Sequence, residues 1–334
     1  MNWFNTNKTT DEQRNVSAEL ASIYSNGVHL SIEELLQYQA KSSLIRPVKT
    51  RTLVGALSGS FLARTKGRGM EFDEVRQYQH GDDIRSIDWR VTARTGQTHT
   101  KLFREEIERP VMIATDLTSS MLFGSQLMLK SIQAAHFAAL LTWHAKAKGD
   151  RIGGVVFNEQ QHNELKPRSR QVGVLHYLHA LTALHQPKLA TEPTSRQQCV
   201  NAVEQNCSRL RQLTRPGSLV YFITDGHNIN EAAVRHLSQI SRFCELIICL
   251  ITDPLEHQLP TSKQKLTVAL TDGQQRQLIT LGDRKTMQNY QQHATRLQMF
   301  EHQLLAKTGA RLLNFTASET LESQLKNGVA SWIR

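Results

Sequence analysis

The stretch VMIATDLTSS, residues 111–120, decides the fold of this chain. Its first five residues are apolar or strand-favouring, which is typical of a short buried strand, and Asp116 ends that strand. A second apolar stretch, LVYFIT at residues 219–224, ends in the same way at Asp225. In an open α/β sheet, ligands bind beyond the carboxyl ends of the strands, so the carboxylates that end these two strands mark a candidate site.

Strand and helix patterns alternate along the chain around these two stretches. The other predicted strands cover residues 151–158, 245–253, 265–270, 276–281 and 311–317. The predicted helices cover residues 125–148, 170–184, 195–212, 229–243 and 284–307, and a last helix follows residue 317. Apolar strands that alternate with helices predict an α/β fold with a doubly wound, mostly parallel sheet of the Rossmann type.

The sequence before Pro110 has a different character, so we expect three parts in the chain. Residues 1–45 are predicted to be an N-terminal helical segment, in which Ser31 and Glu34 form a capping box. Residues 46–109 are predicted to be a small β-rich module, with strands in VRQYQ, IDWRVTA and THTKLF. Residues 110–334 would then form the α/β domain.

The composition restricts the classes of partner. The chain of 334 residues has a formal net charge of +10, but the basic residues are spread along it without a basic tail or interleaved aromatic residues. An acidic protein partner explains this charge as well as a nucleic acid does, so we predict no nucleic-acid partner and keep nucleic-acid binding as an alternative. No apolar stretch approaches the roughly 20 residues that span a bilayer, so we expect a cytoplasmic protein without direct membrane insertion.

The polar residues after the first strand have the spacing of a metal site. Asp116, Thr118 and Ser120 are two residues apart, which turns their oxygens the same way in an extended loop. With Asp225 at the same sheet edge, they supply hard oxygen ligands suited to Mg²⁺. The alternative is that Asp116 and Thr118 only cap the helix that follows.

This pattern resembles a known adhesion site. DLTSS followed by a distant TDG is similar to the metal-ion-dependent adhesion site of von Willebrand factor A (vWA) domains, with Thr118 in place of the usual serine. The resemblance implies that Asp116, Thr118, Ser120 and Asp225 hold Mg²⁺, or Mn²⁺ in its place, and that an acidic residue of a partner protein completes the coordination.

The same resemblance implies a threonine ligand from a third loop. The candidates in the sequence ATEPTSRQQ are Thr191, Thr194 and Ser195, and we choose Thr194.

A denser motif precedes the α/β domain. The stretch GRGMEFDEVRQYQHGDDIRSIDWRVTAR resembles the signature of the bacterial family named domain of unknown function 58. The matching positions are Gly69, Glu71, Phe72, Arg76, Tyr78, Gly81, Asp82, Asp83, Arg85, Ile87, Asp88, Trp89, Ala93 and Arg94. The resemblance implies a vWA-like domain and a role as an adaptor or co-chaperone beside a MoxR-type AAA+ ATPase.

Two roles are open for the signature residues. We favour a structural one, in which arginines such as Arg76 and Arg85 pair with carboxylates such as Asp82 and Asp83, while Trp89 and Tyr78 are buried. In the other, part of this surface docks the ATPase.

The function expected from these patterns is that of a non-enzymatic protein-binding adaptor. The alternative of a metal-dependent hydrolase uses the same loop, because Mg²⁺ assists phosphoryl chemistry. The sequence offers no convincing general base or phosphate-binding Lys beside the loop, and it has neither GxxxxGK[ST] nor GxSxG.

Overall fold

The chain forms two compact units. The computed structural model describes residues 16–45, 70–105, 108–185, 195–260, 266–271 and 276–327. The large unit comprises Met1–Arg46 together with Arg109–Arg334, and the small unit comprises Pro47–Glu108. The residues at the start of the chain therefore belong to the same compact unit as the α/β domain.

A six-stranded sheet forms the centre of the large unit, with the order β10-β7-β6-β3-β4-β5. Its strands are β3 (Pro110–Asp116), β4 (Arg151–Phe157), β5 (His162–Arg168), β6 (Leu219–Thr224), β7 (Glu245–Thr252) and β10 (Arg311–Thr316). Neighbouring strands are parallel except β4 and β5, which are antiparallel. The predicted α/β fold with a mostly parallel sheet is confirmed. The edge strand β5 was not predicted, because Leu165 is its one buried residue.

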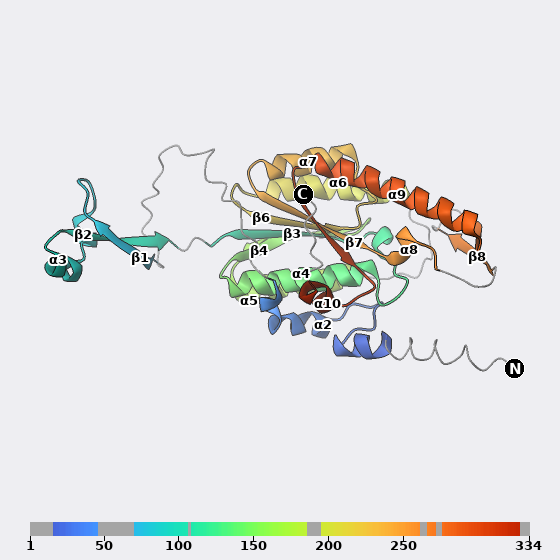
Figure 1. Cartoon of the computed structure of the whole chain (residues 1–334), viewed down its shortest axis with the longest axis horizontal. Helices are drawn as coiled ribbons and strands as arrows, with labels where there is room; N and C mark the ends of the chain where they lie inside the picture. Colours follow the sequence, from blue (N-terminus) through green and yellow to red (C-terminus); the bar gives the residue numbers. More distant parts are fainter. Residues whose placement is uncertain are drawn as a thin grey trace. The chain divides into compact units, whose positions relative to one another are not determined.

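Helices cover both faces of this sheet (Figure 1). One face carries α4 (Lys130–Ala147) and α5 (Arg170–Leu184), and the other carries α6 (Arg196–Leu213) and α7 (Glu231–Ser241). The same unit also contains α2 (Ile32–Leu36), α8 (Pro254–His257), α9 (Arg284–Ala306) and α10 (Leu321–Lys326), and residues 16–22 are helical as well. No helix among the described residues is long and apolar enough to cross a membrane.

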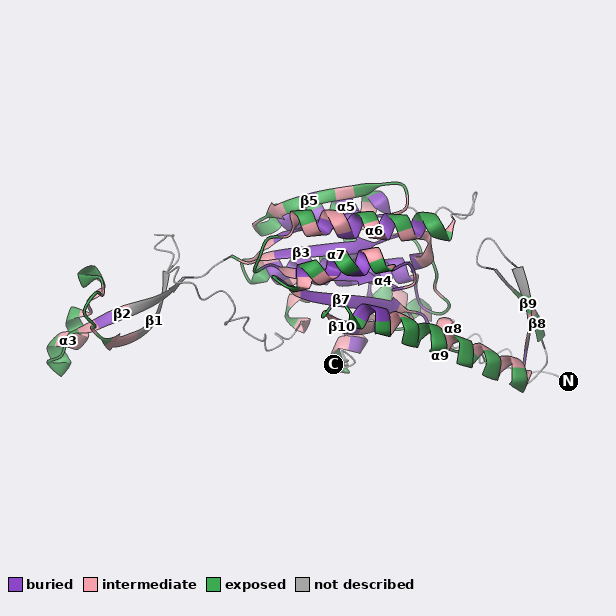
Figure 2. Ribbon diagram, turned by 90° about the horizontal axis from the view of Figure 1, so that it is seen from above, coloured by how far each residue is buried: buried purple, intermediate pink, exposed green. Residues whose placement is uncertain are grey.

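The central strands are buried on both faces, as the purple ribbons of Figure 2 show. Along β3, Val111 and Ile113 contribute to the core under α4 and α5, while Met112 and Ala114 contribute to the core on the opposite face. The next strand approaches β3 very closely at Gly154, where a Cβ atom would lie 1.8 Å from the carbonyl oxygen of Ile113. A side chain at position 154 would therefore separate β4 from the middle of β3, the strand that ends at Asp116.

The N-terminal residues pack on α4. The predicted capping box is present, with the side chains of Ser31 and Glu34 each accepting a backbone hydrogen bond at the start of α2. The indole of Trp143 donates a hydrogen bond of 3.2 Å to the carbonyl oxygen of Leu35, and His136 lies 3.3 Å from the carboxylate of Glu34. These contacts explain why α2, although short, is ordered on the surface of the large unit.

A predicted strand in the small unit is wrong. Its two strands, β1 (Met70–Gln77) and β2 (His99–Glu105), pair antiparallel, but IDWRVTA lies mainly in the helix α3 (Trp89–Thr95). The Asp88 side chain accepts hydrogen bonds from the N–H groups of Arg90 and Val91 in the first turn of this helix, and Gly96 ends it in a left-handed conformation. These two caps outweigh the alternating pattern.

The described residues also form a small hairpin and several short 3₁₀ helices. A separate hairpin consists of β8 (Leu266–Thr271) and β9 (Arg276–Leu281), where the sequence predicts strands. Short 3₁₀ helices lie at Gln37–Gln39 (η1), Ser42–Leu44 (η2), Ile84–Ser86 (η3) and Ser119–Met121 (η4).

Candidate metal-binding site

The loop after β3 gathers three polar side chains. The backbone N–H and the hydroxyl of Thr118 both donate to Oδ1 of Asp116, at 2.9 and 2.7 Å. The hydroxyls of Thr118 and Ser120 lie 3.2 Å apart. Asp116 and Thr118 are fully buried, and Ser120 is partly exposed, so this loop opens to solvent at Ser120.

The second carboxylate comes from the adjacent strand. Because β3 and β6 pair in parallel, Asp116 and Asp225 end neighbouring strands at the same edge of the sheet. Asp225 is buried, and its carboxylate accepts a hydrogen bond from the Ser120 hydroxyl. The structure thus brings Asp116, Thr118, Ser120 and Asp225 together, whereas the predicted ligand Thr194 lies outside the described residues.

The capping alternative does not describe this loop. Thr118 is the residue before η4, but its side chain makes no capping hydrogen bond to that short helix. Its hydroxyl donates instead to Asp116, whose second oxygen accepts from Thr224 at 2.8 Å. The polar side chains therefore point at one another and not at the end of a helix.

The two carboxylates differ in their electrostatic surroundings. Burial and the nearby Asp225 raise the pKa of Asp116 above the usual range of a carboxyl. Burial acts in the same direction on Asp225, but Lys130 and His227 outweigh it and lower the pKa of Asp225. Asp225 is therefore charged and compensated, while the charge of Asp116 is opposed by its surroundings.

Sequence reasoning missed the residues that surround these four. Lys130, at the start of α4, donates to Asp225 at 3.0 Å and to Glu256 at 2.5 Å. The amide of Asn228 donates to the Ser120 hydroxyl at 2.8 Å. One signal was present for Lys130, because a lysine in the first turn of a helix rich in apolar residues needs a partner when it is buried.

His227 links two further carboxylates to this cluster. Its ring nitrogens lie 2.7 Å from Glu301 and 3.3 Å from Glu256. Burial lowers the pKa of His227, but the hydrogen bonds to Glu256 and Glu301 outweigh it and raise that pKa to about 10. The imidazole is thus a charged bridge between α9 and the sheet edge.

The donor set fits a divalent cation in part. Among the described residues, no group of three or more His, Cys, Asp or Glu side chains is placed to hold a metal ion. A metal at this edge would therefore depend on hydroxyls, and Asp116, Thr118 and Ser120 supply a carboxylate and two hydroxyls, which are hard oxygen donors. Asp225 is close, but its charge is already compensated by Lys130.

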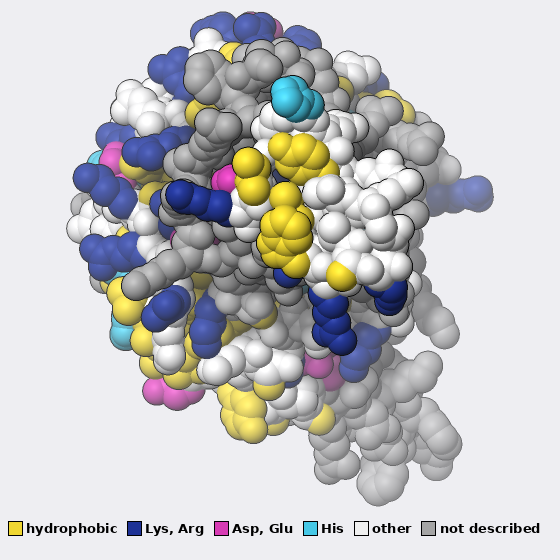
Figure 3. Space-filling view, turned by 90° about the vertical axis from the view of Figure 1, so that its left-hand side faces the viewer, with side chains coloured by type: hydrophobic (Ala, Val, Ile, Leu, Met, Phe, Trp, Pro, Cys, Tyr) yellow, Lys and Arg dark blue, Asp and Glu magenta, His cyan; other side chains and the backbone are white. Residues whose placement is uncertain are grey.

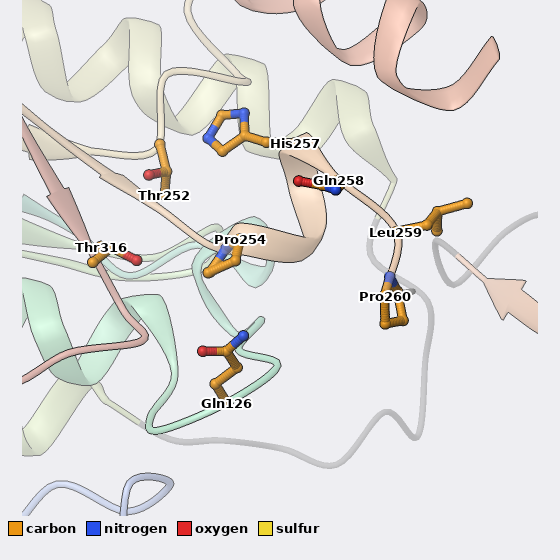
Figure 4. Close-up of a pocket in the computed structure, with 8 residues that line it drawn as sticks. All are labelled: Gln126, Thr252, Pro254, His257, Gln258, Leu259, Pro260 and Thr316. Carbon is orange, nitrogen blue, oxygen red and sulfur yellow. The ribbon is translucent and has the colours of Figure 1, made fainter. Parts of the chain in front are cut away.

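A cavity of about 520 Å³ lies along the same edge of the sheet, at the ends of β7 and β10 (Figure 4). Thr252 and Thr316 end these strands, and α8 borders the cavity through Pro254 and His257. Its lining residues are Gln126, Thr252, Pro254, His257, Gln258, Leu259, Pro260 and Thr316. None of these lining residues is a proposed metal ligand, so this cavity is separate from the metal-site residues.

The signature residues of the small unit are mostly exposed. Arg76 donates to Asp82 at 2.7 Å, which is one ion pair of the expected kind. Trp89, which we expected to be buried, is 67% exposed, and Ile84 is 66% exposed. Tyr78 is partly buried.

The charged signature residues form fewer pairs than we expected. Asp88 caps α3 and lies 3.6 Å from Lys101. Within the described part of the chain, no ion pair is found for three exposed arginines, Arg85, Arg90 and Arg94. Figure 3, which shows the left-hand side of Figure 1, has apolar side chains at the surface among Lys and Arg side chains.

Three other positions of the signature complete its description. Gly81 has a positive φ of 109° in the turn after β1. Asp83 accepts a hydrogen bond from the backbone N–H of Arg85. Glu71 lies in β1, and its side chain is outside the described residues.

Solved structures with partial similarity include two bacterial proteins from Bacteroides. They are the conserved hypothetical protein BatB of Bacteroides thetaiotaomicron (TM-score 0.37, 14% identity, 66% of this chain and 95% of that one) and an aerotolerance-related membrane protein of Bacteroides fragilis (TM-score 0.38, 15% identity, 66% and 98%). A von Willebrand factor type A protein of Catenulispora acidiphila has a TM-score of 0.32 at 10% identity, over 70% of this chain and 42% of that one. Our assignment of the fold class rests on the strand order.

The sequence comparisons identify the family. Uncharacterized proteins of Mycobacterium bovis and Mycobacterium tuberculosis are 36% identical to this chain over 106 residues. The matched stretch covers 32% of this chain and 33% of those relatives, so it spans about a third of their length. Residues 74–299, more than half of the chain, match the family described as "Protein of unknown function DUF58". The protein therefore belongs to the DUF58 family.

Proposed function

We propose that this protein is a non-enzymatic adaptor or co-chaperone. It binds an acidic residue of a partner protein through Mg²⁺ at the Asp116 loop, and it works with a MoxR-type AAA+ ATPase. The main support is the convergence of Asp116, Thr118 and Ser120 with Asp225, more than 100 residues later in the chain, at one edge of the sheet.

The electrostatics of the loop favour a cation. Asp116 is fully buried, and all its hydrogen bonds come from neutral donors, the N–H and hydroxyl of Thr118 and the hydroxyl of Thr224. Mg²⁺ there would compensate the carboxylate and leave positive charge to attract an acidic side chain of the partner. Ser120, the partly exposed member of the loop, faces the side from which such a partner would approach.

The exposed face of the small unit suits the contact with the ATPase. Trp89 and Arg90 are exposed on α3, with Ile84 and Arg85 exposed in the preceding segment. Exposed tryptophan and arginine side chains are the types that contribute most to protein interfaces. We therefore assign ATPase docking to this face, in preference to the structural role that the sequence favoured.

The hydrolase alternative has less support. The cation nearest to the loop, Lys130, is held between Asp225 and Glu256, and His227 is held between Glu256 and Glu301. Neither group is therefore offered to a phosphoryl group or to an attacking water. Turnover of generic phosphoesters that is lost in Asp116→Asn would reverse this ranking.

Asp116→Asn tests the proposed site. Calorimetric titration with Mg²⁺ or Mn²⁺ should show saturable binding to the wild type and none to Asp116→Asn, because the amide lacks the charge while keeping the size of the side chain. Asp150→Asn is the matched control: Asp150 accepts a hydrogen bond from the N–H of Arg109 at the opposite edge of the sheet. Equal binding to the wild type and to Asp116→Asn would show that the metal lies elsewhere.

A further inference from the structure

A lysine is buried beside the proposed metal site. The Lys130 side chain is 1% exposed, and its ammonium group lies 3.0 Å from Asp225 and 2.5 Å from Glu256. The ammonium lies 6.0 Å from the centre of the Phe123 ring, which adds a cation–π contact. A buried ammonium persists only when it is paired, so this position is built to hold a positive charge.

Hydrogen bonds around the start of α4 fix the position of Lys130. The N–H of Lys130 donates to the carbonyl oxygen of Phe123 at 2.8 Å, which closes the loop before α4. The N–H of Ser125 donates to Asp253 at 2.8 Å. Asp253 in turn forms a capping box with Glu256. Asp253, Glu256 and the loop before α4 are therefore connected by hydrogen bonds. Lys130 therefore has little freedom to leave Asp225.

Asp225 is correspondingly occupied. One of its oxygens accepts from Lys130, and the other accepts from the backbone N–H of His227 at 3.1 Å. Asp116 differs, because its hydrogen-bond donors are all neutral. The resemblance to adhesion sites treats the two strand-end carboxylates as equivalent ligands. In the structure, however, Lys130 compensates the charge of Asp225, whereas Asp116 accepts hydrogen bonds from neutral groups.

We propose that Lys130 is the permanent counter-ion of Asp225, so that a divalent cation at this edge has Asp116 as its one carboxylate ligand, beside the hydroxyls of Thr118 and Ser120. The inference rests on the proposed function for the presence of the metal. It departs from the resemblance to adhesion sites, which makes Asp225 a ligand. A tethered cation in this position also lowers the affinity for the metal, because two like charges a few ångströms apart repel.

The first test compares the Mn²⁺ affinities of three substitutions by calorimetry. Asp225→Asn should weaken binding by about tenfold, because Asp225 supports the Ser120 hydroxyl and compensates Lys130 without being a ligand, whereas Asp116→Asn should weaken it by at least about a hundredfold. Lys130→Met should bind Mn²⁺ at least about tenfold more tightly, because Asp225 is released. Lys41→Met is the control, since it removes a lysine of the N-terminal segment that is paired with Glu322.

The second test does not depend on metal. The urea midpoints of Lys130→Met, Asp225→Asn and the double variant are measured in chelator. Each single substitution leaves a buried charge without its partner, so the double variant should be less destabilised than the sum of the two. Additive midpoint shifts would mean that the two groups do not act as a pair.

The outcomes distinguish a failure of this inference from a failure of the proposed metal site. If Asp225→Asn loses as much affinity as Asp116→Asn, Asp225 is a ligand and the inference fails while the proposed metal site stands. If the wild type binds no Mn²⁺ but Lys130→Met does, Lys130 holds the metal out, which supports the inference and refutes a metal-dependent function of the wild type. If neither binds Mn²⁺, both the inference and the metal site are wrong.

Discussion

The two motif-bearing regions of this protein use polar residues in opposite ways. In the large unit, Asp116 and Thr118 are buried and hydrogen-bonded to each other, and Asp116 also accepts from Thr224 at the end of the neighbouring strand. In the small unit, the longer and more specific motif contributes the ion pairs Arg76–Asp82 and Asp88–Lys101, while Trp89 and Ile84 are largely exposed. Motif density alone therefore does not tell whether residues build a site or a surface.

The two tryptophans of these regions give the largest expected contrast. Trp143 is 2% exposed and donates a hydrogen bond to Leu35, so Trp143→Ala should destabilise the protein by about 3–5 kcal/mol, because it leaves a cavity in the core. Urea unfolding followed by circular dichroism measures this loss. A loss below about 1 kcal/mol would mean that the core on the α4 side of the sheet repacks to fill the space left by the indole.

A buried histidine supplies the next contrast, through pH. Burial lowers the pKa of His185 to about 4 from its ordinary 6.5, and one ring nitrogen lies 3.0 Å from the Ser131 hydroxyl. The unfolded chain takes up this proton more readily, so the stabilisation is present above pH 6.5 and is lost as the pH falls toward 4. The loss is about 3 kcal/mol.

His185→Gln checks this assignment because glutamine does not titrate. The variant should lose less unfolding free energy than the wild type between pH 7 and pH 4.5, as measured by urea titration at each pH. His176→Gln, at an exposed position on α5, the helix that ends just before His185, controls for the loss of a histidine. Parallel pH profiles for the wild type and His185→Gln would remove His185 as the source of the acid sensitivity.

The smallest effect on stability is expected at the exposed tryptophan. Trp89→Ala should change the free energy of unfolding by no more than about 0.5 kcal/mol, because a side chain that is 67% exposed contributes little packing. The same variant should bind the MoxR-type ATPase at least about tenfold more weakly in a pull-down or calorimetric titration, as expected for an interface tryptophan. Unchanged binding together with a large stability loss would return Trp89 to a structural role.

Local patterns were sufficient for most elements of the large unit. Helix α5 has the predicted bounds, and α6, which starts at a capping box formed by Ser195 and Gln198, differs from its prediction by one residue at each end. Helix α4 begins at Lys130 and not at Ser125, because Asp253 accepts hydrogen bonds from the N–H and hydroxyl of Ser125 and holds it in the loop. That contact joins residues 128 positions apart, so no local pattern contains it.

The sequence by itself determined the alternation of strands and helices, the mostly parallel sheet and the placement of Asp116 and Asp225 at one edge of that sheet. These features depend on periodicity and on strand ends, which are local properties. The tertiary structure alone decided that Lys130 compensates Asp225 across 95 residues and that Trp89 is exposed. Charge pairing and burial depend on which distant segments meet, and that is fixed only when the chain has packed.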